Sequence, residues 1–521
     1  MHVSVIQSPL PLTLKFVVHL ISFGIAGLLF SCQEDDVPPP PSTAKAFTGF
    51  SFLAANNPGF PDEDLSYAIH KNYVNAMFPL GLRTDSLIAS FGSTAASVLI
   101  DTVVQHSDST VNNFTQPITY TLMAEDSSTA NYEIRPHLFT GVPVVYIETE
   151  GQAPVVSKDE YVDGQITIIA NGRGEENVSK ADIEIRGRGN TTWEMPKKPY
   201  RIRFSERTEV LGMSEHKIWV LLANFSDKTL LRNHTAFKLS QRFGLAYTPQ
   251  SQFVDLWVNG AYQGNYQLTE QIRIDESRLN IDELKADDIS EDKITGGYLL
   301  EVDGRRDEDV SFKSAQGVRF VIKSPDEDVP EQTAYIRQYV QTAEDALFAD
   351  NFADAQQGYA QYFDTESFVD WYLLNELTKN TDAKFSNSVY LHKPRGGKLT
   401  MGPVWDYDIG MGNVNYSPGE FTEGWYIREA SWIKRLFEDP AFEQRVTARW
   451  QVLKPEIEAV IAEIDQEAAR LDQSQQLNFQ KWNILGRRVW PNPVATGSYA
   501  GEVAYLKDWL TKRVAWMDSQ F

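Results

Sequence analysis

Apolar and polar residues alternate in short stretches between residues 46 and 138, and turn-forming residues separate these stretches. The stretches that predict strands are GFSFLAAN, LIASFG, SVLIDTVVQ, ITYTLMAED and NYEIRP. A period of two over so few residues is typical of strands with one buried face. We therefore expect a small β-sandwich over residues 46–138, with no catalytic constellation of its own.

A second unit, residues 142–521, is predicted to begin with strands near Val142. The stretches VPVVYIETEG and GQITIIANG predict single strands, and ADIEIRGRGNTTWEMPKKPYRIRF predicts two strands joined by a glycine-containing turn. The stretch SDKTLLRNHTAFKLSQRFG predicts a helix that is capped at Ser226 or Asp227 and ended by Gly244. The stretch FVDLWVNGAYQGNYQLTEQI predicts a hairpin that turns at Asn259-Gly260.

The pattern becomes helical from Glu331 to Phe348, from Thr365 to Lys379 and after about Ser431. A β-hairpin is predicted between the second and third of these helical regions. Apolar residues at spacings of three and four predict one buried face of a long helix: Leu453, Ile457, Val460, Ile461, Ile464, Ala468 and Leu471. Strands followed by helices indicate an α+β protein, and we expect two lobes with a ligand cleft between them.

The amino-acid composition limits the classes of protein to which the chain can belong. The chain has 521 residues, of which 42% are hydrophobic and 23% charged, as in globular proteins with two or three domains. Its net charge of -23 argues against binding bare nucleic acid or an anionic lipid surface. An anionic ligand would therefore need a local basic pocket.

The single cysteine, Cys32, excludes an intramolecular disulfide. It follows Lys15 and a mostly apolar run from Phe16 to Phe30, which is shorter than the roughly 20 residues of a membrane span. The run fits a signal peptide, and LFSC resembles a bacterial lipobox. We expect residues 1–31 to be removed and Cys32 to be lipidated. A short membrane anchor or a chance apolar leader is the alternative.

The segment after Cys32 begins QEDDVPPPPSTA. Its prolines predict a stiff, extended spacer over residues 32–45. Its acidic residues resemble the signal that sends some lipoproteins to the cell surface. The expectation is an outer-membrane lipoprotein, exposed on the cell surface, that touches the membrane only through its lipid.

Acidic residues flank the predicted hairpin. Asp382, Lys384 and Asn387 have the spacing D-x-K-x-x-N of the protein-kinase catalytic loop, and the hairpin returns the chain to Asp406 and Asp408. In phosphoryl transfer, one aspartate orients the attacking hydroxyl, while an asparagine and a second aspartate hold Mg²⁺. The aspartate-to-asparagine spacing also occurs elsewhere in this chain, so it is weak alone. The alternative is that Asp382 caps a turn and Asp406 pairs with a surface lysine.

A basic block, RGRGNTTWEMPKKPYRIR, contrasts with the acidic chain. Its charged residues are Arg186, Arg188, Lys197, Lys198, Arg201 and Arg203. Its glycines and Asn190 could turn backbone amides toward phosphates, and its cations could reach phosphate oxygens. The alternative is a solvated strand face that balances acidic neighbours.

Five blocks, in order along residues 142–521, resemble the CotH (spore coat protein H) kinase family. They are GRGNTTWEMPKKPYRIRF, WVLLANFSDKTLLRN, YQGNYQLTEQI, GGYLLEVD and LTMGPVWDYDIGMGN. The resemblance implies an atypical protein-kinase-like fold, ATP and Mg²⁺ as cofactors, and transfer to serine or threonine of a protein. In the N-terminal unit, FTQPITYTLMAEDSSTANYEIRP resembles the last hairpin of immunoglobulin-like modules in surface lipoproteins.

The resemblance also assigns roles by position. Asp382 matches the catalytic aspartate, with Lys384 in the same loop, and Asp406 matches the metal-binding aspartate. Asn387 and Asp408 lie where further metal contacts are expected. On the nucleotide side, either Lys197 or Lys198 matches the basic residue, and the alternatives stay open because neighbours on a strand face opposite ways.

The chain departs from the usual kinase pattern in two places. Asn380 and Thr381 replace the usual His-Arg before Asp382. The predicted helix from Asp227 to Phe243 has no interior glutamate to pair with a lysine, so Arg232 is expected to contact a phosphate or a carboxylate. Glu270 and Glu301 are other candidate partners for the lysine. Neither a P-loop nor an H-E-x-x-H motif occurs.

Three functions remain open from the sequence. The first is a surface-anchored protein kinase that uses Mg-ATP on a protein substrate. The second is a catalytically inactive kinase-like scaffold or adhesin. The third is a glycan enzyme with Asp406 and Asp408 as its carboxylate pair, but two aspartates one residue apart suit a shared metal better than the separation of a glycosidase pair.

Overall fold

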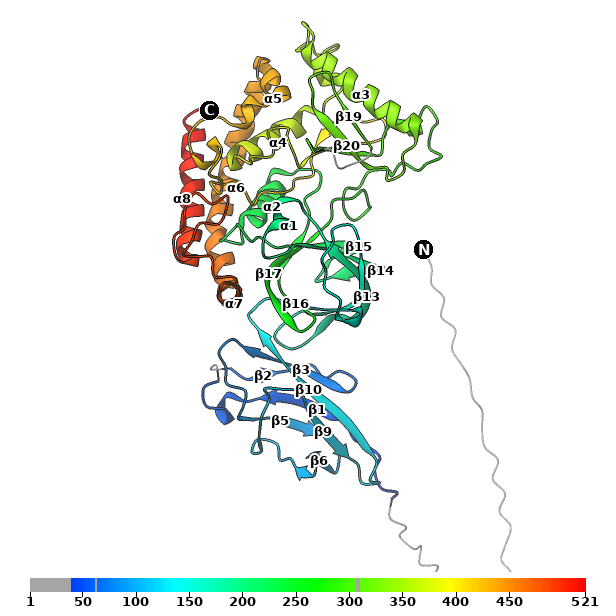
Figure 1. The fold of residues 1–521 in the computed structure, drawn as a ribbon, viewed down its shortest axis with the longest axis vertical. Coiled ribbons are helices and arrows are strands. Elements are labelled where there is room, and N and C mark those ends of the chain that lie inside the picture. The colour runs from blue at the N-terminus through cyan, green and yellow to red at the C-terminus, as the bar shows by residue number, and fades with distance from the viewer. Residues whose placement is uncertain (1–38, 61–62, 306–309) are drawn as a thin grey trace, which may run out of the picture.

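A computed structural model describes residues 39–60, 63–305 and 310–521 (Figure 1). The predicted signal peptide, Cys32 and the first part of the tether lie outside these ranges, so lipidation stays a prediction. Within these ranges, no helix is both long enough and apolar enough to cross a bilayer.

The described residues of the N-terminal module form short strands in three sheets, with the orders β2-β1-β5, β3-β10-β9-β6-β7 and β4-β8. The strands are β1 Phe47–Phe52, β2 Leu65–Ser66, β3 Tyr73–Pro79, β4 Leu87–Ile88, β5 Ser90–Ser93, β6 Ser97–Ile100, β7 Val103–Val104, β8 Val111–Asn112, β9 Ile118–Met123 and β10 Thr129–Phe139. The two larger sheets share one core, which includes Phe52, Phe78 and Tyr120. The sheets agree with the predicted strands, and the immunoglobulin-like relationship stays a prediction.

Seven strands above this module close into a barrel (Figure 1). The strands are β11 Val144–Thr149, β12 Val162–Ile169, β13 Glu176–Gly187, β14 Tyr200–Val210, β15 Met213–Leu222, β16 Ser251–Val258 and β17 Ala261–Glu270. The order is β11-β12-β13-β14-β15-β17-β16, and parallel pairing of β11 with β16 closes the barrel. Asn259 and Gly260 have φ of 49° and 73°, as the predicted hairpin turn requires. The closure itself was not predicted.

The third part combines a five-stranded sheet with helices. The sheet order is β19-β20-β18-β21-β22, from β18 Tyr298–Val302, β19 Ser311–Lys313, β20 Arg319–Ser324, β21 Val389–Lys393 and β22 Thr400–Met401. The helices are α3 Pro330–Phe348, α4 Thr365–Thr378, α5 Ser431–Leu436, α6 Pro440–Arg470, α7 Asp472–Lys481 and α8 Tyr499–Asp518. Sheets and helices together confirm an α+β protein. Helices α6 and α8 pack side by side (Figure 1).

Two further helices join the barrel strands. Helix α1, Thr191–Glu194, lies between β13 and β14, and helix α2, Arg232–Phe243, lies between β15 and β16. Helix α2 was expected to begin near Asp227. It begins later because the Asp227 side chain accepts hydrogen bonds from the backbone N–H groups of Thr229 and Arg232, which holds the intervening residues in a turn. Gly244, at φ 77°, ends the helix as predicted.

The predicted hairpin between α4 and the later helices is strands β21 and β22, where Leu391 pairs with Met401. Helix α4 is buried on nearly every side, and Lys379 ends it in the left-handed region at φ 42°. The chain leaves this buried helix just before Asp382, and the hairpin brings it back to Asp406. The sequence therefore placed both acidic segments correctly around the hairpin.

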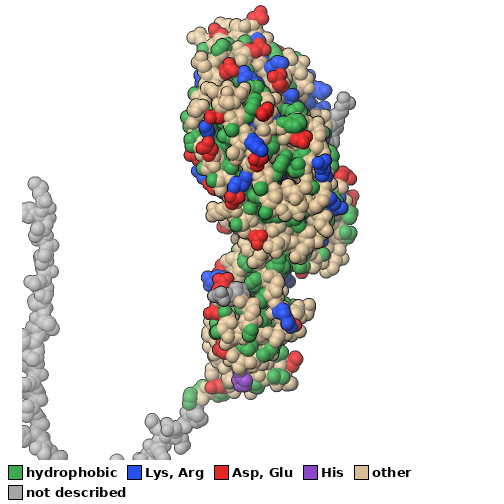
Figure 2. Space-filling view, turned by 90° about the vertical axis from the view of Figure 1, so that its left-hand side faces the viewer, with side chains coloured by type: hydrophobic (Ala, Val, Ile, Leu, Met, Phe, Trp, Pro, Cys, Tyr) green, Lys and Arg blue, Asp and Glu red, His purple; other side chains and the backbone are tan. Residues whose placement is uncertain are grey.

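The N-terminal module forms a distinct body joined to the rest by a narrower waist (Figure 2). At this junction the hydroxyl of Tyr73 donates to Glu176 at 2.9 Å, and a His137 ring nitrogen lies 2.8 Å from the hydroxyl of Tyr146. On the face shown in Figure 2, acidic and basic side chains are interspersed.

Candidate functional site

A cavity of about 500 Å³ lies between the barrel and the third part of the chain. The barrel contributes the end of β13, the loop that follows it, the start of β14 and the end of β15. The opposite wall comes from the end of β18 and from the segments on either side of the β21–β22 hairpin. The cavity therefore lies where a cleft between two lobes was expected.

The acidic wall contains four of the residues that the sequence singled out: Asp382, Asn387, Asp406 and Asp408 all line the cavity. The Asn387 side-chain oxygen accepts a hydrogen bond of 3.2 Å from the backbone N–H of Gly304, and the Ser388 hydroxyl donates to an Asp406 carboxylate oxygen at 3.3 Å. The structure thus brings both acidic segments to one place.

Mutual repulsion between these carboxylates is visible in their pKa values. Burial, and then the charge of Asp406, raises the pKa of Asp382 to about 6. Burial raises the pKa of Asp408 well above its usual range, and the charges of Asp406, Asp227 and Asp382 add to this effect. A group of carboxylates that repel one another stabilises a bound cation.

The acidic wall fits a cation that arrives with its ligand. Within the described residues, no three or more His, Cys, Asp or Glu side chains are arranged to hold a metal ion by themselves. Mg²⁺ typically needs only one or two carboxylates, because waters and substrate phosphates complete its coordination. Asp406, with Asn387 and Asp408 beside it, could supply the protein's share.

Asp406 and Asp408 lie in a loop and not on a strand. They follow β22 in a loop in which Asp406 has the left-handed φ of 67°. The two carboxylates nevertheless act on each other, because the charge of Asp406 adds to the rise in the pKa of Asp408.

The basic wall is built on a pair of arginines. Arg186 and Arg201 are directly opposite each other across β13 and β14, and both line the cavity. Like charges at opposed positions repel each other. The Nε atom of each is buried and lacks a hydrogen-bond partner, and burial lowers the pKa of Arg201 to about 10. Among the described residues neither arginine forms an ion pair, and two partly buried cations side by side favour an anion between them.

Two more predicted residues complete this wall. Arg188 lines the cavity with its guanidinium 5.5 Å from the ring centroid of Trp405, and burial lowers its pKa while the charge of Asp406 raises it. Asn190 also lines the cavity, and its side-chain oxygen accepts a hydrogen bond of 3.1 Å from Lys158.

Neither lysine of the KKPY block lies in the cavity, contrary to the expectation for the nucleotide side. Lys197 is buried, and its Nζ donates to the backbone oxygen of Asn265 and, at 2.9 Å, to the side chain of Asn478 in α7. Lys198 turns back and donates to the carbonyl of Trp193. Both ammonium groups are satisfied by protein oxygens outside the lining of the cavity.

Three other predicted residues also lie outside the cavity lining. Arg232 is buried and forms an ion pair of 2.6 Å with Asp227, which fits the expected contact with a carboxylate but not with a phosphate. Glu270 is buried and accepts hydrogen bonds from Tyr247 and Gln250. The ammonium of Lys384 lies 5.1 Å from the ring centroid of Tyr426. None of the three lines the cavity.

A lysine–glutamate pair does line the cavity. The sequence pointed to its glutamate as a candidate but not to its lysine. Glu301 of β18 lies 3.7 Å from the ammonium of Lys323 in β20. Burial raises the pKa of Glu301 to about 7. The partner of Glu301 thus comes from a neighbouring strand on the acidic side and not from the KKPY block.

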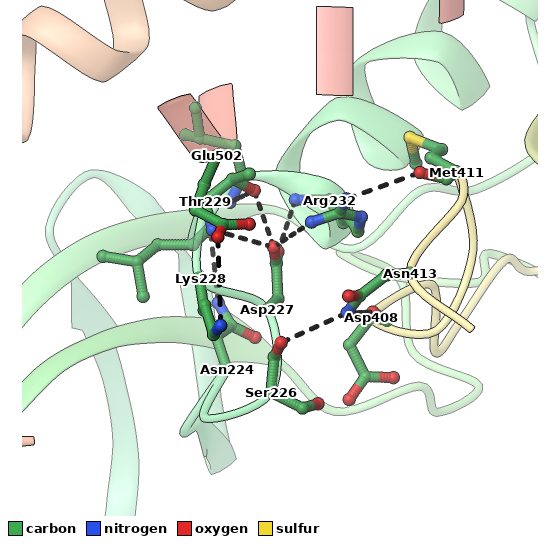
Figure 3. A network of polar contacts seen from close by, with 12 residues as sticks. Asn224, Ser226, Asp227, Lys228, Thr229, Arg232, Asp408, Met411, Asn413 and Glu502 are labelled. Carbon is green, nitrogen blue, oxygen red and sulfur yellow. Dashed lines mark hydrogen bonds and ion pairs between the residues drawn. The ribbon is translucent and has the colours of Figure 1, made fainter. Parts of the chain in front are cut away.

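A buried polar network fixes the acidic loop from behind (Figure 3). Arg232, held by Asp227, donates to the carbonyls of Gly410 and Met411 at 3.2 and 3.4 Å. The Asn413 side chain donates to the backbone oxygen of Asp408 at 2.8 Å. The first turn of α2 therefore positions the segment that carries the cavity carboxylates.

Sequence reasoning missed cavity residues such as Asn233, Tyr416 and Trp490. None belongs to a recognisable motif, and the chain segments that carry them meet only in the folded protein. Arg201 was visible as part of the basic block, but nothing in the sequence distinguished it from Lys197.

Comparisons with known proteins show the family of the chain. Residues 185–517, more than half of the chain, match the family described as CotH kinase protein. No curated protein matches the chain. A crystal structure of a candidate glycoside hydrolase from Bacteroides thetaiotaomicron is similar at 15% identity and a TM-score of 0.18, over 35% of this chain and 53% of that one. The chain therefore belongs to the CotH kinase family.

Proposed function

We propose that the cavity binds Mg-ATP and that the protein transfers the γ-phosphate to a serine or threonine hydroxyl of a protein acceptor. One observation carries this proposal: a single cavity has mutually repelling carboxylates on one wall and, on the other, arginines that form no ion pair with any described residue. Such a site complements a cation and a polyphosphate together.

Each wall has a distinct role in the proposed reaction. Arg186, Arg188 and Arg201 bind the phosphate chain. Asp382 orients the acceptor hydroxyl and accepts its proton, and Asn387 and Asp406 hold the metal. A Mg²⁺ ion held by these residues would offset the negative charge that develops on the phosphates during transfer.

The experiment compares nucleotide binding with catalysis in the purified protein. ATP at millimolar concentration should stabilise the fold by roughly 1–2 kcal/mol if its Kd is tens of micromolar. The stabilisation should require Mg²⁺ and disappear in Asp406→Ala. Transfer of ³²P from ATP to a generic protein substrate should be lost in Asp382→Ala.

The outcomes separate the kinase from the alternative of an inactive scaffold or adhesin. Binding without transfer in the wild type would support a kinase-like scaffold. If neither Mg-ATP stabilisation nor transfer occurs, the nucleotide site is refuted.

We also propose that the protein is an outer-membrane lipoprotein displayed on the cell surface. The LFSC stretch and the acidic, proline-rich tether after Cys32 support this. Labelled fatty acid should be incorporated into the wild type and not into Cys32→Ser. Equal labelling of both would contradict the anchor.

A further inference from the structure

The cavity includes an exposed aromatic pair. Tyr416 and Trp490 stack with ring centroids 5.7 Å apart and planes at 9°, and both line the cavity. They remain 51% and 53% exposed, although large aromatic side chains bury much apolar area when they are covered. We call this pair the aromatic step. Rigid, partly exposed tyrosine and tryptophan residues are typical anchor points for a binding partner.

Buried amides hold the aromatic step in place. Asn492, two residues after one ring, donates to the side-chain oxygen of Asn413 at 2.8 Å and to the backbone oxygen of Ser226 at 2.7 Å. Asn413 in turn donates to the backbone oxygen of Asp408 (Figure 3). Both asparagines are buried. The step is therefore fixed relative to the acidic loop.

The surroundings of the step show which side of the cavity it occupies. The hydroxyls of Thr381 and Ser417, the chain neighbours of Asp382 and Tyr416, lie 3.4 Å apart, so Tyr416 lies beside Asp382. A nucleotide must present its γ-phosphate to Asp382, so its base lies at the other end of the phosphate chain. The step is thus on the side from which an acceptor enters.

The chain just before Trp490 is basic. Arg487 and Arg488 are exposed, close in sequence to Trp490, and the described residues offer neither guanidinium an ion pair. A neutral saccharide would leave this charge unused, whereas a polypeptide with an acidic side chain would use it. Aromatic and basic groups together favour an acceptor with complementary aromatic and acidic side chains.

We propose that the aromatic step docks a polypeptide acceptor whose aromatic side chain stacks on Trp490 and Tyr416 while a neighbouring carboxylate meets Arg487 and Arg488. The assignment of this surface to the acceptor rests on the proposed function. The docking itself needs no nucleotide.

Calorimetric titration of the full-length protein without nucleotide tests the docking. The probe is a random copolymer of glutamate and tyrosine, compared with polyglutamate, a lysine–tyrosine copolymer and maltoheptaose. We expect the glutamate–tyrosine copolymer to bind at least about tenfold more tightly than the other three. Trp490→Ala should weaken its binding about tenfold, and Trp490→Phe should retain it. Phe421→Ala, at an aromatic residue 62% exposed and outside the cavity lining, should have no effect.

The proposal is overturned if polyglutamate or maltoheptaose binds equally well, or if Trp490→Ala weakens Mg-ATP and not the copolymer. The two proposals fail separately. A wild type that binds the copolymer but not Mg-ATP refutes the nucleotide site and leaves the docking surface. A wild type that binds Mg-ATP but not the copolymer refutes the docking surface alone.

Discussion

The side-chain oxygen of Asn233 accepts a hydrogen bond of 2.7 Å from the backbone N–H of Tyr407. Tyr407 separates Asp406 from Asp408, so this contact sets the backbone between the two cavity carboxylates. Asn380 fixes the same loop from the other side by donating to the backbone oxygen of Asp406 at 3.2 Å.

Asn233→Ala should weaken Mg-ATP binding by roughly tenfold, because the Tyr407 N–H loses its partner and the loop loosens. Asn233→Asp, which keeps an acceptor, should retain more of the affinity. The matched control is Asn375→Ala, since the Asn375 oxygen accepts from the Tyr407 hydroxyl at 3.0 Å but does not line the cavity. Equal loss of affinity in the two alanine variants would contradict a positioning role for Asn233.

Arg232→Ala should lower the free energy of unfolding by about 3–5 kcal/mol, because it leaves Asp227 buried without its ion-pair partner. Denaturant unfolding followed by tryptophan fluorescence measures the loss. Arg242, in the same helix, pairs with Glu456 and Glu463 at the surface, and Arg242→Ala should cost less than about 1 kcal/mol. If both variants lose a similar amount of unfolding free energy, the buried Arg232–Asp227 pair is no more important for stability than the surface pairs of Arg242.

Lys197 and Arg201 should give opposite results. Lys197→Ala should destabilise the fold, because it removes the link between the barrel and Asn478, and should leave Mg-ATP affinity unchanged at temperatures where the variant is folded. Arg201→Ala should weaken Mg-ATP binding severalfold without loss of stability, because it relieves the repulsion from Arg186. Unfolding curves and calorimetric Mg-ATP titrations check both. If Lys197→Ala weakens Mg-ATP binding and Arg201→Ala does not, Lys197 has the nucleotide-side role that the sequence predicted.

Asp255 should make the fold less stable as the pH rises from about 4 to 6. Burial raises its pKa in the folded protein from 3.8 to about 6, so the folded state binds more protons than the unfolded state in this range. The contribution of Asp255 to the free energy of unfolding is fully present below pH 3.8 and is lost as the pH passes 6. The total loss is roughly 3 kcal/mol. We expect the unfolding free energy of the wild type, measured relative to that of Asp255→Asn, to fall as the pH rises from 3.5 to 7. A constant difference would contradict it.

Gly264→Ala should destabilise the barrel and its contact with α7. Gly264 has φ of 124°, and an added Cβ would lie 2.6 Å from the Asn478 oxygen and 2.8 Å from Cε of Lys197. Gly260 provides the control, since it also has a positive φ of 73° but has no atom within 4 Å of an added Cβ. Gly264→Ala should lower the melting temperature by several degrees more than Gly260→Ala. Equal shifts would show that only backbone strain matters.

Features encoded over a few residues were predictable from the sequence. The turn at Asn259-Gly260, the helix stop at Gly244 and the hairpin before Asp406 follow from local backbone preferences. Because only the β21–β22 hairpin and its flanking turns separate Asp382 from Asp408, their convergence could also be inferred from local structure.

Long-range contacts could not be predicted in this way. Nothing near Lys197 reveals that its ammonium meets Asn478, 281 residues later in the chain. The same holds for Trp490, which reaches Tyr416 through loops without a motif. Barrel closure depends on parallel pairing between Val144 and Asp255, and alternation within a strand does not specify its partner.

The parallel seam between β11 and β16 also dictates an order of events during biosynthesis. The first barrel strand must wait for the sixth in the chain to emerge before its edge is covered, while the N-terminal module is already complete. The cavity's carboxylates emerge later still, onto a barrel that can already be closed. A chain that has emerged only as far as β12 to β15 therefore has an exposed β11 edge. Such incomplete chains should be the ones most prone to aggregate.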